Sequence, residues 1–188
     1  MDTAGNLHVF GISQNGVNSK VFYQLVFLNN TLGTYAVIQN PGGNLPGQEA
    51  YFQPAISGNN VLIGLVDPSD TYVTIAVGTP LTAPVFTILA SPGIDSAQPF
   101  SGVRLGSPVL AADSTGVYAA YLLESQITGV SQIRLVGTQN INAPLTGWVN
   151  SIVALGPQNG ILAAGFLGIN RQNGNLFATW NGAAALGS

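Results

Sequence analysis

The sequence contains no cysteine and very few charged residues. Without cysteine there is no disulfide framework, no thiolate nucleophile and no cysteine-ligated metal site. Lys, Arg, Asp and Glu together make up 6% of the 188 residues, whereas about 25% is usual in globular proteins. The four basic residues are too few to build the positive stripe with which proteins bind nucleic acid. The composition therefore excludes a disulfide-bonded scaffold and an electrostatic nucleic-acid binder.

Helical patterns are missing as well. Glu and Lys, which favour helices, are scarce, and no window shows apolar residues at helical spacing. Long apolar runs are also absent, so no membrane-spanning helix is expected. The N-terminus shows neither the basic start nor the apolar run of a signal peptide. Few Lys residues among many Asn, Gln, Ser, Thr and Gly nevertheless favour an extracellular or surface-exposed location.

Short apolar runs separated by turn residues are what the sequence does contain. Its 24 glycines and 11 prolines bound segments rich in Val, Ile, Leu, Tyr and Phe, which is typical of strands. Residues 62–66 are apolar on both faces, and such a strand is usually covered on both faces. We predict one all-β domain over residues 1–188. The expected strands are 7–12, 21–28, 34–38, 61–66, 72–77, 85–89, 108–112, 117–123, 132–136, 151–155, 161–165 and 175–180.

Turns followed by apolar strands recur along the chain. The strands that follow these turns begin at Leu7, Val61, Val117 and Ile161, which are 54, 56 and 44 residues apart. A period near fifty is in the range of β-propeller blades. The repeat divides the chain into units of roughly 1–50, 51–100, 101–149 and 150–188. Short strands at 53–56, 108–112 and 151–155 are expected to open the last three units, and the first unit lacks this strand.

One unit resembles a known family. Residues 107–121, which read Ser-Pro-Val-Leu-Ala-Ala-Asp-Ser-Thr-Gly-Val-Tyr-Ala-Ala-Tyr, resemble the inner hairpin of sialidase-type, Asp-box (BNR-like) β-propellers. Residues 129–138 and the Thr-Gly-Trp that ends at Trp148 are similar to the third strand and the closing Trp of that unit. The complete Asp-box, Ser-x-Asp-x-Gly-x-Thr-Trp, is not intact anywhere in the chain.

The resemblance implies a β-propeller-like fold with about four antiparallel blades, and a β-sandwich or jelly roll is the alternative. Because the first unit lacks its inner strand, two arrangements are expected. Either residues 182–186 close the ring onto the first unit, or the chain is part of a larger propeller. In the second case exposed sheet edges would pair with another copy of the chain.

Candidate catalytic residues are few. His8 is the only histidine, and a metal site or a Ser-His-Asp triad would need further partners around it. We interpret His8 as a strand residue that faces a rim or a neighbouring element. Sialidases bind the substrate carboxylate with three arginines, but the positions of Arg104, Arg134 and Arg171 do not match the family pattern. These features favour a non-catalytic protein, with a glycosidase-like propeller fragment as an alternative.

Most carboxylates lie in turn sequences. Asp67 and Asp70 belong to an Asp-Pro-Ser-Asp turn signature, and a calcium site on these two residues is the alternative interpretation. Asp2 and Asp113 precede strands, where an Asp side chain accepts backbone N–H groups. No other metal or cofactor is predicted.

Aromatic residues near uncharged polar loops suggest the function. Sugars offer C–H faces and hydroxyl groups, which aromatic rings and amide side chains bind. The sequence therefore predicts a non-catalytic recognition module that binds a neutral glycan or a protein surface through its loops. A structural subunit of a virion or surface filament is the alternative, and self-association is expected. The predicted ligand-binding residues are Trp148, expected to be the exposed aromatic, with Tyr72, Asn142 and Arg171.

Overall fold

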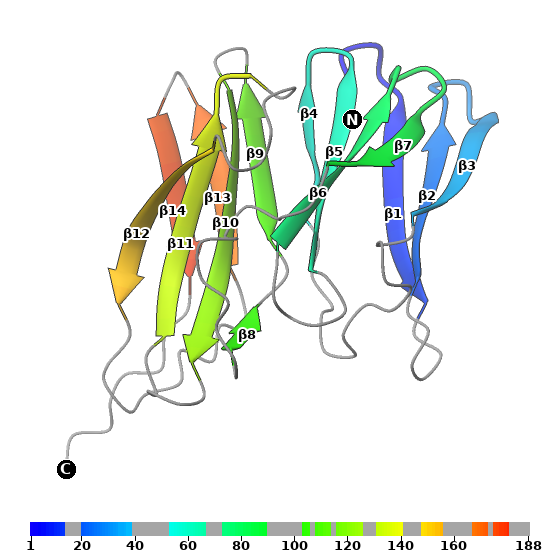
Figure 1. The fold of residues 1–188 in the computed structure, drawn as a ribbon. Helices are drawn as coiled ribbons and strands as arrows, with labels where there is room; N and C mark the ends of the chain where they lie inside the picture. Colours follow the sequence, from blue (N-terminus) through cyan, green and yellow to red (C-terminus); the bar gives the residue numbers. More distant parts are fainter. Residues whose placement is uncertain are drawn as a thin grey trace.

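The structure is a computed structural model that describes residues 1–13, 20–38, 53–66, 73–89, 103–105, 108–113, 116–125, 131–140, 148–155, 167–172 and 175–180. All regular elements in these ranges are strands, which confirms the predicted all-β class (Figure 1). The strands are β1 (Leu7–Ser13), β2 (Lys20–Val26), β3 (Leu32–Ile38), β4 (Ala55–Ser57), β5 (Asn60–Val66), β6 (Val73–Thr79), β7 (Val85–Ile88), β8 (Val103–Leu105), β9 (Val109–Asp113), β10 (Gly116–Ser125), β11 (Ser131–Thr138), β12 (Val149–Leu155), β13 (Leu167–Gln172) and β14 (Asn175–Trp180).

The strands form four antiparallel sheets, which we number in chain order. Sheet 1 is β1-β2-β3, sheet 2 is β4-β5-β6-β7, sheet 3 is β9-β10-β11-β12, and sheet 4 is β13-β14. The short strand β8 pairs with the C-terminal end of β10, whereas β9 pairs with the N-terminal half of β10. Each sheet therefore connects strands that follow one another in the sequence. Within the described ranges none of the sheets closes on itself.

One predicted strand has a different partner from the one expected. Residues 151–155 were expected to open the fourth unit, but they belong to β12, which pairs with β11 as the last strand of sheet 3. Composition identified the strand but not its partner, because an apolar strand pairs equally well with either neighbour. The strand expected at 161–165 and the segment 182–186 lie outside the described residues.

Sheets 1 to 4 pack face to face in chain order. Along β5 alternate side chains point to opposite sides: Ile63 and Leu65 pack on sheet 1, and Leu62 packs on sheet 3. This arrangement confirms that a strand apolar on both faces is covered on both faces. Stacked antiparallel sheets are compatible with both the propeller-like and the sandwich interpretation. The buried core residues are Val21, Tyr23, Leu25, Ile38, Val61, Ile63, Leu65 and Ala76 between sheets 1 and 2; Ala55, Leu62, Ile75, Val77, Leu110, Val117, Ala119, Tyr121, Val136 and Trp148 between sheets 2 and 3; and Val109, Ala111, Ala120 and Ile169 between sheets 3 and 4.

Gln53 joins three of the sheets at one point. It lies two residues before β4, and its backbone forms a parallel bridge with Val109 of β9, where Leu110 N–H donates to the Gln53 carbonyl at 2.8 Å. The Gln53 side-chain amide donates to the carbonyls of Leu110 and Ile169, and Ile169 N–H donates back to its Oε1 at 3.3 Å. The start of sheet 2 is therefore bonded to both β9 of sheet 3 and β13 of sheet 4.

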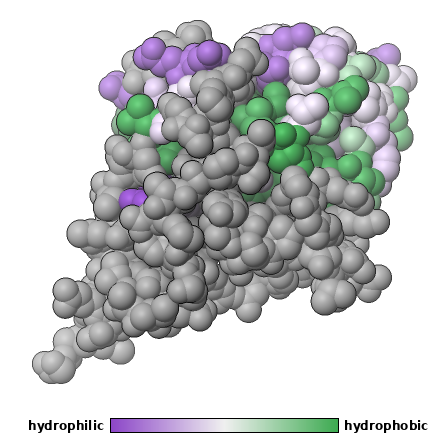
Figure 2. Space-filling model, in the orientation of Figure 1, coloured by the Kyte–Doolittle hydropathy of each residue, from purple (hydrophilic) through white to green (hydrophobic). Residues whose placement is uncertain are grey.

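Apolar residues also reach the surface. Figure 2 shows them gathered over the half of the molecule that sheets 1 and 2 form, with hydrophilic residues along the upper edge of the view. In the ranges that the structure describes, no helix has the length and apolar character needed to cross a bilayer.

Candidate functional site

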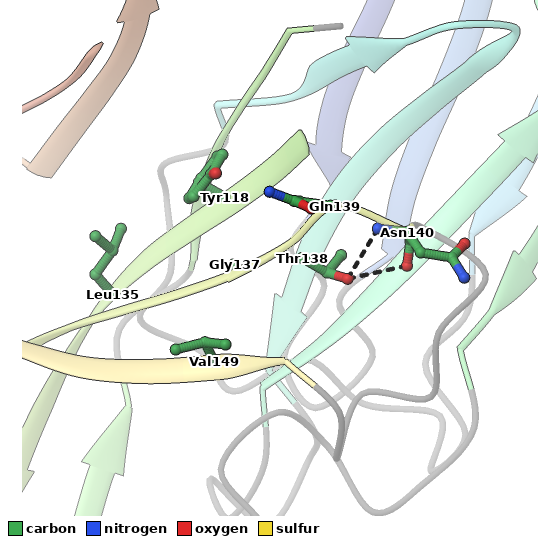
Figure 3. A pocket seen from close by; sticks show the side chains of 7 residues that line it. All are labelled: Tyr118, Leu135, Gly137, Thr138, Gln139, Asn140 and Val149. Carbon is green, nitrogen blue, oxygen red and sulfur yellow. Dashed lines mark hydrogen bonds between the residues drawn. The ribbon is translucent and has the colours of Figure 1, made fainter. Parts of the chain in front are cut away.

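A pocket of about 500 Å³ opens on sheet 3, over the strands farthest from β9 (Figure 3). Strand β10 contributes Tyr118, and β12 contributes the exposed Val149. The remaining lining residues come from β11 and the segment that follows it: Leu135, Gly137, Thr138, Gln139 and Asn140.

The alternation of side chains along β10 places Tyr118 in this pocket. Tyr118 and Tyr121 are three residues apart, so they project from opposite faces of the strand. Tyr121 is fully buried between sheets 2 and 3, whereas Tyr118 lies on the face that packs against sheet 4. Strand β13 contacts β9 and β10. The part of this face formed by β11 and β12 is where the pocket opens.

A glycine leaves room for the Tyr118 ring on the sheet surface. Tyr118 and Gly137 are direct cross-strand partners, and the ring lies against the glycine backbone. A Cβ atom at residue 137 would lie 2.5 Å from Tyr118 Cδ1, so the ring would have to shift to accept a side chain there. The glycine therefore lets the aromatic ring lie flat along the sheet and form one wall of the pocket.

Uncharged polar groups form the rim of the pocket. The Thr138 hydroxyl donates to the Asn140 carbonyl at 3.0 Å and accepts the Asn140 N–H at 3.1 Å, which fixes the chain after β11. Gln139 and Asn140 are exposed at the rim (Figure 3). Among the described residues that line the pocket, the Tyr118 phenol is the one ionisable side chain. An aromatic face beside amide and hydroxyl groups suits an uncharged ligand rich in hydroxyls.

Of the predicted ligand residues, the two that the structure describes, Trp148 and Arg171, do not line this pocket. Trp148 was expected to be exposed, but this prediction is wrong, because the side chain is 5% exposed and packs between sheets 2 and 3. Arg171 was expected in a loop but lies in β13, paired with Leu176. Tyr72, Asn142 and the candidate calcium ligands Asp67 and Asp70 lie outside the described residues.

Tyr118 was not among the predicted ligand residues, although the sequence carries a signal for it. The two tyrosines of residues 117–121 stand at a separation that puts them on opposite faces of a strand, so one of them had to face away from the main core. Which face stays open depends on how far sheet 4 extends over sheet 3. How far one sheet covers another depends on the packing of distant segments, so it cannot be predicted from a local sequence pattern.

His8 belongs to a second polar cluster, at the junction of sheets 1 and 2. Its Nδ1 lies 2.8 Å from the Tyr23 hydroxyl, and its Nε2 lies 3.3 Å from Asp2 Oδ2. With the imidazole neutral, Nε2–H donates to the carboxylate and Nδ1 accepts the Tyr23 O–H. The His8 and Asp2 side chains are 3% and 4% exposed. His8 therefore faces neighbouring side chains inside the fold, as the sequence predicted.

Asp2 also fixes the turn before β1. Its Oδ1 accepts the backbone N–H groups of Ala4 and Asn6, both at 2.9 Å, which confirms the turn role predicted for this residue. Burial opposes ionisation of the carboxyl, but hydrogen bonds from Asn6, His8 and Ala4 outweigh it and lower the pKa of Asp2 from 3.8 to about 2. Burial, followed by the nearby Asp2 charge, raises the pKa of Tyr23 from 10.0 to about 12.

These two pKa shifts predict a stability plateau with two limits. The unfolded chain protonates Asp2 below about pH 4, so the stabilisation from its ionised form is lost as pH falls from 3.8 through 2. The unfolded chain deprotonates Tyr23 above pH 10, so the stabilisation from the neutral phenol is lost as pH rises from 10 through 12. Urea unfolding across the pH range measures both limits.

Two variants assign these limits to their residues. Asp2→Asn should flatten the acid limit, and Tyr23→Phe should flatten the alkaline limit. If either variant loses stability in parallel with the wild type over its own pH window, the assignment of that window is wrong.

Metal ligands do not gather in the described part of the chain: no group of three His, Cys, Asp or Glu residues there lies close enough to hold a metal ion. The calcium site considered for Asp67 and Asp70 stays a prediction. Comparisons with protein-family models, with curated proteins and with solved structures found no match to this chain. The resemblance to Asp-box propellers therefore also stays a prediction.

Proposed function

We propose that the protein is a non-catalytic recognition module of an extracellular or surface-exposed protein, which binds a neutral glycan in the pocket on sheet 3. The observation that carries this proposal is the Tyr118 ring, which lies against Gly137 beside the exposed amides of Gln139 and Asn140. A sugar ring stacked on Tyr118 would place its hydroxyls near these amides. Binding of this kind needs no cofactor.

The same proposal includes a propeller-like arrangement of the sheets. In a simple stack of layers, sheet 2 would meet sheet 3 and not sheet 4. Gln53, at the start of sheet 2, bonds to both β9 and β13, which supports a radial arrangement in which the first strands of successive sheets converge. Strands β9 and β10 contain residues 109–113 and 116–125, where the resemblance to the Asp-box hairpin was noted.

The chemistry of the lining favours binding over catalysis. Glycoside hydrolysis uses a pair of carboxyl groups about 5 to 9.5 Å apart, and the described residues that line this pocket include no carboxylate. A recognition module needs only shape, an aromatic face and polar groups, all of which the lining supplies.

Removal of the aromatic face tests the proposal. We expect Tyr118→Ala to weaken binding of a neutral oligosaccharide about tenfold, because ring stacking contributes roughly 1 kcal/mol beyond buried area. Tyr118→Phe keeps the ring and should bind within about threefold of the wild type. The ligand is first selected on a glycan array, and the affinities are then measured by isothermal titration calorimetry.

Tyr35→Ala is the matched control, because Tyr35 is an exposed tyrosine, 59% accessible, on sheet 1 and not in the pocket. It should leave the affinity unchanged, and circular dichroism should confirm that each variant is folded. A folded wild type that binds no glycan on the array would contradict the proposal. So would glycan binding that Tyr118→Ala leaves intact.

A further inference from the structure

Sheet 1 has an outer face that is apolar across all three strands. Cross-strand partners project to the same side of a sheet, and the pairings Leu7↔Val26, Val9↔Gln24 and Phe22↔Val37 therefore define one face. The opposite face, with Tyr23 and Leu25, packs on sheet 2. Five large side chains of the outer face are 40% to 71% exposed: Leu7, Val9, Leu32, Tyr35 and Val37.

Within the described strands, this face carries one charged residue, Lys20, which the register places at the start of β2 opposite Ser13. Its single amide, Gln24, turns back to its own sheet, where Nε2 donates to the carbonyls of Leu25 at 2.8 Å and Gly33 at 3.2 Å. On the same face the rings of Phe22 and Tyr35 stack on each other, with centroids 6.1 Å apart. A charged partner surface would therefore lose its water over the exposed Leu, Val and Tyr side chains without gaining an opposite charge from them. The face suits another apolar sheet.

The far end of the stack differs. The outer side of sheet 4 presents the exposed residues Asn170, Asn175 and Thr179, with Phe177 as its exposed large apolar side chain. Head-to-tail packing of sheet 1 on sheet 4 would bury amides against Leu and Val, which is costly. Packing of sheet 1 on its own copy buries the exposed Leu, Val and Tyr side chains against one another.

We propose that the outer face of sheet 1 is a self-association surface, on which a second copy of this chain docks to form a two-fold symmetric dimer. A two-fold contact uses the same patch on both copies and closes without forming a filament. Covering the exposed side chains on both copies would remove on the order of 1,000 Å² of surface from water, which is near the lower limit for a specific interface. The dimer is therefore expected to be weak, with a dissociation constant in the micromolar range.

Charge introduced in the middle of β1 on this face tests the dimer. Val9 is 47% exposed, so Val9→Lys and Val9→Glu should fold but place like charges across the two-fold axis. Sedimentation velocity from about 1 µM to about 1 mM should show a monomer–dimer equilibrium for the wild type. Each variant alone should stay monomeric over the same range. An equimolar mixture of the two should recover a dimer, because the charges are then opposite.

Phe177→Lys, on the outer side of sheet 4, is the matched control and should dimerise like the wild type. Val37→Lys, on β3, replaces Val9→Lys if circular dichroism shows that the β1 variants are unfolded. A wild type that is monomeric at every concentration would overturn the proposal, as would Val9→Lys that dimerises normally. Assemblies that grow beyond a dimer and are lost in Phe177→Lys would show a head-to-tail contact instead. The test does not involve the pocket, so its result is independent of glycan binding.

Discussion

Trp148→Ala should lower the free energy of unfolding by about 3–5 kcal/mol, the usual cost of removing a buried aromatic side chain. Trp148 is 5% exposed and packs between sheets 2 and 3 with Leu62, Ile75 and Leu110. A loss of this size is a large part of the roughly 5–15 kcal/mol that stabilises a typical domain. Urea or thermal unfolding followed by circular dichroism measures it.

Two further variants separate packing from other effects at this position. Val149→Ala, at the neighbouring residue that is 74% exposed, should change stability by less than about 0.5 kcal/mol. Trp148→Phe should cost less than Trp148→Ala, because it keeps an aromatic ring. It also removes an indole N–H that finds no hydrogen-bond partner among the described residues. If Trp148→Ala kept wild-type stability and lost only ligand binding, the exposed position predicted from the sequence would be right after all.

Gly64→Ala should destabilise the protein by about 3 kcal/mol, the upper end of the cost of overpacking. Gly64 lies in β5, on the side that faces sheet 3. A Cβ atom there would lie 2.2 Å from Pro108 Cγ and 2.8 Å from the Pro108 carbonyl oxygen. Because one of these atoms belongs to the backbone just before β9, the two sheets would have to move apart. Thermal unfolding provides the measurement.

Gly11→Ala is the control for this substitution. Gly11 lies in β1, and a Cβ atom at residue 11 would meet no atom within 4 Å. Its substitution should be neutral or stabilise by up to about 1 kcal/mol, because alanine loses less conformational freedom on folding. Equal stability changes for the two variants would show that the close approach at Gly64 has no energetic role.

The strands and their burial were largely predictable because both depend on local pattern. The run Leu62-Ile63-Gly64-Leu65-Val66 has no polar face, and no strand can keep such a sequence in water at low cost. The structure places Leu62 and Ile63 in different core clusters on opposite sides of sheet 2. The turn role of Asp2 was predictable for the same reason, since its partners Ala4 and Asn6 are close in the sequence.

The errors concern relations between segments that are distant in the sequence. Residues 151–155 were recognised as a strand, but their pairing with β11 was not predicted, because composition does not determine which neighbouring strand is the partner. Trp148 follows a Thr-Gly turn sequence, which suggested exposure, yet the neighbouring sheet covers it. The hydrogen-bond partners of His8 could not be predicted from the sequence either. The register of β1 and β2 brings Tyr23 of β2 within hydrogen-bond distance of His8 of β1.

One feature of the candidate pocket depends on local sequence, and another depends on pairing between distant strands. The hydrogen bonds between Thr138 and Asn140 are local and typical of a turn sequence. The position of Tyr118 over Gly137 follows from a register that joins residues 19 apart, as the difference of their numbers shows. No pattern within β10 alone indicates that its partner there is a glycine.

The order of the sheets has a consequence for how the chain folds. Sheets 1 to 4 follow one another in space as they do in the sequence, and each is a meander of consecutive strands. Most contacts are thus made within a unit or with the next unit, as in repeat proteins, whose cooperativity passes from neighbour to neighbour. Sheets 2 and 3 have a packed neighbour on each face, whereas sheets 1 and 4 each have one within the described residues. Native-state opening should therefore begin at the terminal sheets, and amide hydrogens of β5 and β10 should exchange last.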